Sequence, residues 1–183
     1  MHRLKSIKLY FFSIIKLFFL NLKNYYFKSK FYNKKLITFI PDRIFYSPSS
    51  YLSASLTTIS NDFYKITNSS PELLWKISEK DKQKFETLHN FLWLTKLDRK
   101  NSKKLTKEII TSWINNFFDY NPSTWKMETT AKTILAWTSN TVITLEDSDK
   151  IYKEKVFLSL VKQSNFILKN LNSLFHDPSK IIC

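Results

Sequence analysis

The stretch that decides the fold is KVFLSLVKQSNFILKNLNSLF, residues 155–175. Its apolar residues recur at i, i+3, i+4 and i+7, which is the spacing of one face of an α-helix. We predict a long amphipathic helix here, ended by Pro178, because proline cannot continue a helix. The residues of the predicted face are Phe157, Leu160, Val161, Ser164, Ile167, Leu168, Leu171, Leu174 and Phe175.

Three further helices precede this one. One runs from residue 81 to about Thr95, a second from about Lys103 to Phe118, and a short third one ends near Trp137. The breaks between them read DRKNS, DYNPS and LEDSD, and the last also supplies N-cap candidates. Consecutive amphipathic helices with short connections are expected to pack as antiparallel hairpins. The apolar positions are Phe85, Leu88, Phe91, Leu92, Leu105, Ile109, Ile110, Trp113, Ile114, Phe117, Ala131, Ile134, Leu135 and Trp137.

Residues 1–40 predict a basic amphipathic helix. On a helical wheel five lysines fall within one arc, and most of the apolar residues lie away from it. The apolar run from Leu9 to Leu20 is shorter than the ~20 residues of a membrane span. Lys16 interrupts that run and no Ala-x-Ala-like site follows, which disfavours a cleaved signal peptide. The lysines are Lys5, Lys8, Lys16, Lys23 and Lys30, and the apolar residues are Leu4, Ile7, Phe11, Ile14, Phe18 and Leu22.

Three roles for this helix stay open. It could lie on an anionic membrane surface, dock its apolar face on the rest of the fold, or act as an uncleaved targeting signal. Residues 41–80 have a different character, with Pro41, Pro48 and serine clusters that indicate loops. We predict a linker there with one or two short extended segments, followed at Ser70-Pro71-Glu72 by a helix start.

Composition limits the classes of function. Of 183 residues, 43% are hydrophobic and 16% aromatic, so a core is expected, and the net charge is +14. Glycine is absent while Lys, Asn, Ile, Phe and Tyr abound, which indicates an AT-biased genome that inflates lysine. The charge is therefore read either as a solvated lysine surface or as the mark of an anionic partner. Only three residues are arginine, which disfavours specific nucleic-acid recognition.

Few residues suggest catalysis. Cys183 is the only cysteine, so an internal disulfide is impossible and the compartment stays undetermined. His2, His89 and His176 are too far apart in sequence for a zinc motif, and the absence of glycine excludes phosphate-binding loops. His89 could be a general base, but its place between Leu88 and Phe91 favours a structural histidine. We predict no catalytic residue, no metal and no cofactor.

A series of short motifs resembles a known family. LHNFLWLTKL at residues 88–97 resembles the Leu-His-x-Phe-x-Trp-Leu segment of heparinase II/III-like proteins, which are polysaccharide-lyase relatives. The order of the later features is similar too: WI at 113–114, NPSTW at 121–125, AKTILAW at 131–137, then SN, then SLVKQSNFILKNL. The resemblance covers roughly residues 85–183. Thr133 departs from it, because an arginine often precedes the isoleucine in the family.

The resemblance implies an architecture and a substrate class. Members have an incomplete α/α toroid of helical hairpins followed by a β-sandwich, with an anionic polysaccharide bound between them and cleaved by elimination. The family's catalytic residues come from later in the toroid and from the sandwich. We therefore expect a mainly α chain whose residues 81–183 form the N-terminal part of a toroid, truncated and catalytically silent. The alternative is a small basic helical protein that associates with anionic membranes through residues 1–30.

Three residues are the candidates for polysaccharide binding. Trp125 and Trp137 could offer aromatic platforms for sugar rings, and the Asn140 amide could bind hydroxyl or carboxylate groups. The alternative is that both tryptophans pack between helices, because aromatic residues at helical spacing usually belong to a core. Asn140 would then cap a helix C-terminus, and one tryptophan edge could still line a groove.

Overall fold

The computed structural model describes residues 2–44, 71–76 and 80–171. These residues are mainly helical and include no β-strand, which confirms the predicted mainly α class. The extended segments predicted within residues 45–70, and the part of the last helix beyond residue 171, lie outside the described residues. The elements are α1 (His2–Lys28), α2 (Lys30–Lys35), α4 (Pro71–Leu74), α5 (Lys82–His89), the 3-10 helix η1 (Leu92–Lys96), α6 (Lys103–Phe117), α7 (Met127–Ser139), α8 (Thr141–Thr144) and α9 (Lys150–Asn170).

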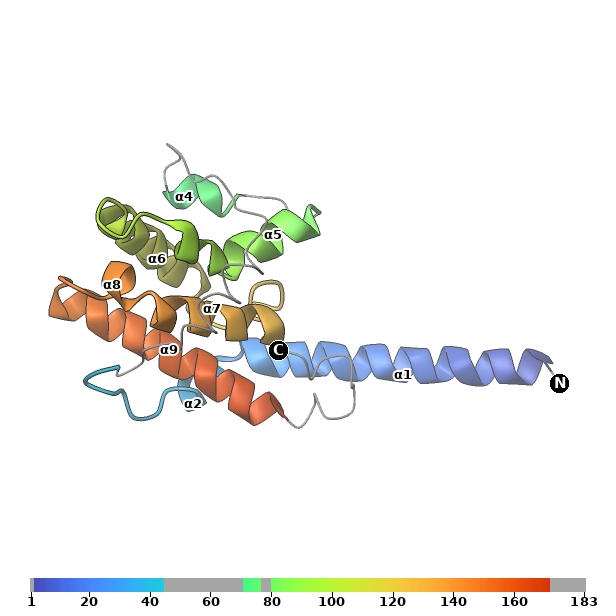
Figure 1. The fold of residues 1–183 in the computed structure, drawn as a ribbon. Helices are drawn as coiled ribbons and strands as arrows, with labels where there is room; N and C mark the ends of the chain where they lie inside the picture. The colour runs from blue at the N-terminus through green and yellow to red at the C-terminus, as the bar shows by residue number, and fades with distance from the viewer. Residues whose placement is uncertain (1, 45–70, 77–79, 172–183) are drawn as a thin grey trace.

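Helix α1 projects from the rest of the chain as a long rod, and its C-terminal end meets a body formed by the other helices (Figure 1). The helical segment predicted for residues 1–40 is divided at Ser29, whose hydroxyl accepts a hydrogen bond from the Tyr32 amide at 3.1 Å. Ser29 is thus the N-cap of α2, and serine favours this position because its oxygen satisfies a free amide of the first turn. The chain therefore turns at Ser29 and places α2 against α9 instead of continuing α1.

The body is built around a cluster of aromatic and aliphatic residues from α5, η1, α6, α7 and α9. Phe91 lies edge to face with Trp113 and Trp137, at ring-centroid distances of 5.9 and 5.3 Å, and the two indoles are 5.5 Å apart. Edge-to-face pairs of this kind add to the free energy gained from burial alone. In Figure 1, α7 and α9 run side by side, and both helices contribute buried residues to this cluster.

A second, smaller cluster attaches α1 and α2 to the body. It contains Phe27, Tyr32, Leu36, Trp125 and Phe166. The Phe27 ring stacks on Tyr32 at 4.5 Å and meets the edge of Tyr120 at 5.0 Å. The N-terminal segment is therefore held to the body by its residues 24–36.

The helix predicted from residue 81 to Thr95 is divided into α5 and η1. Phe91 adopts a left-handed conformation with φ of 58°, and the Asn90 side-chain oxygen accepts a hydrogen bond from the Leu92 amide at 2.9 Å. The physical reason is burial: the four consecutive residues 91–94 all lie in the core, and an unbroken helix would turn some of them toward solvent. The Trp93 indole closes the break by donating to the Leu88 carbonyl oxygen at 3.1 Å.

The other predicted helices agree closely with the structure. The helix predicted over Lys103–Phe118 is α6, and the one predicted to end near Trp137 is α7. Asp149, from the LEDSD break, is the N-cap of α9 and accepts a hydrogen bond from the Tyr152 amide at 2.8 Å. Within the part of the chain that is described, no helix combines the length and apolarity that crossing a membrane requires.

Candidate functional site

The three residues predicted to bind polysaccharide do not meet in one site. Trp137 belongs to the main core and Trp125 to the second cluster, and their side chains are only 1% and 2% exposed. The Trp125 indole donates to the Phe117 carbonyl oxygen at 2.9 Å and so satisfies a free carbonyl at the end of α6. Neither tryptophan offers an open face for a sugar ring.

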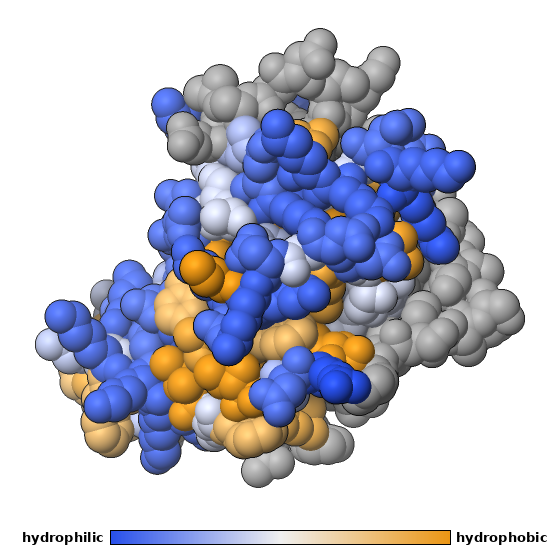
Figure 2. Space-filling view, turned by 90° about the vertical axis from the view of Figure 1, so that its left-hand side faces the viewer, coloured by the Kyte–Doolittle hydropathy of each residue, from blue (hydrophilic) through white to orange (hydrophobic). Residues whose placement is uncertain are grey.

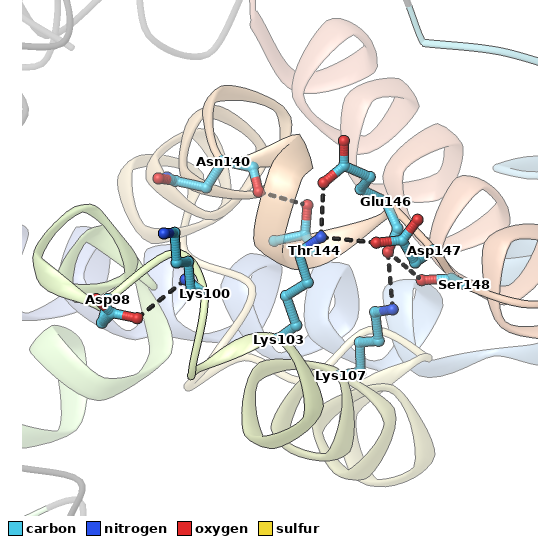
Figure 3. Close-up of polar contacts among 9 residues, drawn as sticks. All are labelled: Asp98, Lys100, Lys103, Lys107, Asn140, Thr144, Glu146, Asp147 and Ser148. Atoms are coloured by element: carbon cyan, nitrogen blue, oxygen red, sulfur yellow. Dashed lines mark hydrogen bonds and ion pairs between the residues drawn. The ribbon is translucent and has the colours of Figure 1, made fainter.

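Asn140 lies at the junction of α7 and α8. Its side-chain amide donates to the Ala136 carbonyl oxygen at 2.8 Å, and its backbone carbonyl oxygen accepts from the Thr144 hydroxyl at 3.1 Å. The second of these contacts is drawn in Figure 3. Asn140 therefore ends one helix and starts the next, and it is half-buried.

His89 is buried in the core, outside any groove. Its ring is surrounded by Phe85, Phe117 and Trp75, at centroid distances of 4.2, 4.9 and 5.3 Å. Burial lowers the pKa of His89 to about 4, so the imidazole is neutral at pH 7. Nδ1 accepts a hydrogen bond from the Trp113 indole at 3.0 Å, which places the ring proton on Nε2. A histidine fixed in this way cannot reach a ligand at the surface.

An open groove of about 860 Å³ lies between α6 and the first two turns of α9. One wall is the polar face of α6, on which residues three and four apart stand one above the other. The opposite wall comes from the start of α9, and Pro71 of α4 lies at one side. The lining residues are Pro71, Lys107, Glu108, Thr111, Ser112, Asn115, Asn116, Asp149, Ile151, Tyr152 and Lys155.

Hydrogen bonds fix the centre of the groove. The Ser112 hydroxyl accepts from the Trp75 indole at 2.9 Å, and the Ser112 carbonyl oxygen accepts from the Asn116 amide at 2.8 Å. Tyr152 is 9% exposed, and its buried hydroxyl has no hydrogen-bond partner among the described residues. Burial raises the pKa of Tyr152, so this hydroxyl keeps its proton at neutral pH. The α6 wall of the groove is therefore tied to the chain after α4, and the Tyr152 hydroxyl lies buried behind the surface of the groove.

The charges at the groove are balanced. Two lysines, Lys107 and Lys155, and two carboxylates, Glu108 and Asp149, line the groove. Lys107 donates to the Glu146 carbonyl oxygen at 2.8 Å, as drawn in Figure 3, whereas Lys155 is exposed and makes no hydrogen bond or ion pair with the described residues. Lys155 is thus the groove cation that is available to a ligand.

Lys103, at the start of α6, is held by two ion pairs. Its ammonium group lies 2.7 Å from carboxylate oxygens of both Glu146 and Asp147, as drawn in Figure 3. The hydrogen bonds with Asp147 and Glu146 raise the pKa of Lys103. This cluster links the start of α6 to the loop between α8 and α9.

The lining of the groove indicates which kind of ligand would suit it. Amides, hydroxyls and one available cation suit a ligand rich in hydroxyl groups with some negative charge. No group of three metal-ligating side chains occurs among the described residues, and His89, the one histidine whose side chain is described, lies elsewhere. Sequence reasoning missed the groove because its residues are common polar types; the available signal was the polar stripe of α6 at helical spacing.

Comparison of the chain with models of protein families, with curated proteins and with solved structures gives no match in any of the three. The resemblance to heparinase II/III-like proteins therefore depends on the motifs in the sequence and on their order. Their histidine and tryptophan positions, His89, Trp93, Trp113, Trp125 and Trp137, are all buried.

Proposed function

We propose that this chain forms the first helices of a heparinase II/III-like toroid and that the groove between α6 and α9 binds an acidic polysaccharide. The observation that carries the proposal is the lining of the groove, where side-chain amides and hydroxyls gather around an exposed lysine. Sugar hydroxyls both donate and accept hydrogen bonds, and amide side chains do the same.

Each part of the groove has a role in this proposal. Asn115 and Asn116 are exposed and bind sugar hydroxyls. Lys155 binds the carboxylate of a uronate unit. The negative charges of Glu108 and Asp149 offset the positive charges of the two lysines. The groove therefore selects a polymer by the hydroxyl groups of that polymer as well as by its negative charge.

The buried motif residues support the toroid part of the proposal. Trp93, Trp113 and Trp137 join η1, α6 and α7 in one core, so the segments that resemble the family are the ones that hold the helices together. A scaffold of this kind is what the N-terminal region of a toroid supplies. The proposed activity of this chain is binding and not cleavage, because the resemblance places the family's catalytic residues later in the toroid and in the β-sandwich.

Titration calorimetry with polygalacturonate, and with dextran as the neutral polymer, tests the proposal. We expect salt-sensitive binding of polygalacturonate that K155E or the double change N115A/N116A weakens about tenfold. K100E is the matched control, because Lys100 is exposed, carries the same charge and does not line the groove. Equal weakening by K100E and K155E would indicate attraction by net charge alone and would overturn the groove assignment.

A further inference from the structure

Helix α1 exposes an unusual amount of apolar surface. Phe11, Phe18 and Phe19 are 62%, 63% and 62% exposed, and Leu9 is 71% exposed. The end of the body that faces away from the free end of α1 is covered mainly by hydrophilic side chains, with one apolar patch low in the view of Figure 2. Extended apolar surface of this kind normally marks an interaction site. The body of this chain does not cover these residues of α1, so their partner must be another molecule.

Only the last turns of α1 are covered by the body. Phe27 is buried against Tyr120 and Phe166, and the Asn24 side-chain oxygen accepts a hydrogen bond from the Tyr120 hydroxyl at 3.2 Å. Residues on a helix are separated by roughly 100°, which places Phe11, Phe18 and Leu22 opposite Phe27. The face that carries these three residues is consequently turned away from the side on which α1 meets the body.

The charge of this segment is of one sign. Residues 1–41 contain nine basic residues and no acidic residue, since the first carboxylate of the chain is Asp42. Nine of the 14 net positive charges thus belong to the first 41 residues, and the other 142 residues supply five. Lys16 and Lys23 lie on one flank of α1, and the Lys23 ammonium group is 5.2 Å from the Phe27 ring. A partner of this helix must be both apolar and anionic.

A second copy of α1 does not meet that requirement. Pairing two such helices would cover their apolar faces but would bring like charges together with no carboxylate on either helix to offset them. An anionic lipid surface supplies both acyl chains and negative headgroups. Lysine side chains can lie along apolar surface and extend their ammonium groups to the headgroups, which accommodates Lys16 within the apolar run.

We propose that α1 lies in the plane of an anionic lipid surface, with Phe11, Phe18 and Leu22 in the acyl region and the body held on the aqueous side. The helix is about 40 Å long, and a helix at this depth buries roughly 5–10 Å of its width. That depth immerses the face of Phe11, Phe18 and Leu22, and it leaves the side of Lys16 and Lys23, where Leu9 and Leu20 also lie, at the headgroups. Tyr10 lies on the flank of the inserted face, at the level of the headgroups, where tyrosine is favoured. This inference goes beyond the polysaccharide groove and does not depend on it.

Co-sedimentation of the full chain with vesicles tests the inference. We expect binding to vesicles of phosphatidylcholine with phosphatidylserine, and binding to phosphatidylcholine alone that is weaker by about tenfold or more. F11S/F18S should weaken binding to the anionic vesicles by about tenfold. F12S/F19S is the matched control, because Phe12 and Phe19 are equally exposed but lie on the lysine side, and it should weaken binding by about threefold or less.

Two further measurements keep the test decisive. In a C183S background, an environment-sensitive dye on F18C should shift to shorter wavelength on vesicle addition, and more strongly than the same dye on F12C. Equal loss of binding in both phenylalanine pairs, together with equal dye shifts, would overturn the proposed orientation. Failure of the unchanged chain to bind anionic vesicles would overturn the proposal itself, as would a lipid-free dimer that F11S/F18S dissociates. The polysaccharide affinity of F11S/F18S should equal that of the unchanged chain, so the two proposals fail separately.

Discussion

The Trp113 indole donates a hydrogen bond of 3.0 Å to Nδ1 of His89 inside the core. This bond joins α6 to the end of α5 and selects the neutral tautomer with its proton on Nε2, for which the described residues offer no partner. A charged imidazolium donates from both nitrogens and needs an acceptor at each, and the indole N–H cannot accept a hydrogen bond. The core is therefore built around a histidine that must stay neutral.

We predict that His89 makes the stability of the fold depend on pH. Its pKa is about 4 in the folded chain and about 6.5 in an unfolded one, so the unfolded state binds more protons between these values. As the pH drops from 6.5 to 4, protonation of His89 should lower the free energy of unfolding by about 3 kcal/mol. Above pH 7 the contribution of His89 should stay constant.

Urea unfolding at pH 7 and at pH 4.5 measures this effect. H89N is the informative variant, because its side-chain oxygen can still accept from the Trp113 indole but does not titrate in this range. Carboxylates titrate in both proteins, so the quantity compared is the difference between the unchanged chain and H89N. If both proteins lose the same stability on acidification, His89 does not carry a depressed pKa.

Lys162 forms a second buried polar contact, on α9. Its side chain is 1% exposed, and the ammonium group lies 2.6 Å from an Asp119 oxygen and 3.9 Å from the centre of the Phe118 ring. Burial lowers the pKa of Lys162, and the hydrogen bond with Asp119 opposes that effect. The lysine therefore depends on a carboxylate that is itself mostly exposed.

We predict that removing Asp119 costs more stability than removing the lysine charge. D119A leaves a buried ammonium group without its partner and should cost about 2–3 kcal/mol, whereas K162M keeps the volume and should cost about 1 kcal/mol or less. The double variant should be about as stable as K162M. Thermal and urea unfolding of all four proteins gives the coupling energy, and additive effects of the two changes would contradict the prediction.

Periodicity predicted the helices whose apolar faces are wide and whose ends are marked. Ile109, Ile110 and Trp113 define α6 in this way, and Asp149 marks the start of α9. The division at Phe91 could not be predicted, because four consecutive core residues look like part of a helical face until their neighbours are known. The only local signal was Asn90, whose side chain can replace a backbone hydrogen bond.

The sequence could not predict what covers each helix face. The same pattern in residues 1–30 fits a helix docked on the body and one that projects from it, because amphipathicity does not say what covers the apolar face. Trp125 and Trp137 likewise fit a groove or a core until their burial is known. The α6–α9 groove needs two elements more than 30 residues apart, and none of its residues forms a motif.

Trp125 and Trp137 offer a matched pair of predictions. Both are buried, but the Trp125 indole donates to the Phe117 carbonyl oxygen at 2.9 Å, whereas the Trp137 indole N–H has no partner in the part of the chain that the structure describes. W137F should cost about 1–2 kcal/mol through lost packing alone, and W125F should cost about 1 kcal/mol more because it also leaves that carbonyl unpaired. Equal unfolding free energies for the two variants would contradict this ordering.

Asn33 is the residue on which the attachment of α1 depends most. It is 5% exposed and donates to the carbonyl oxygens of Phe27 and Ser29 at 3.1 and 3.0 Å, while its side-chain oxygen accepts from the Tyr120 amide at 2.9 Å. These three bonds connect the turn at Ser29 to the loop between α6 and α7.

We therefore predict that N33A frees α1 from the body while leaving the main core folded. The change removes the side-chain partners of the Phe27 carbonyl and the Tyr120 amide, whereas the Ser29 carbonyl keeps the Asn33 amide, and it should cost about 2–4 kcal/mol locally. N24A is the matched control, since it removes one half-buried bond to Tyr120 and should cost about 1 kcal/mol or less. Limited trypsin digestion followed by mass spectrometry reads out the result. Cleavage at Lys28, Lys30 and Lys34 should accelerate in N33A ahead of cleavage in α6, and simultaneous cleavage of both regions would show that the two clusters unfold together.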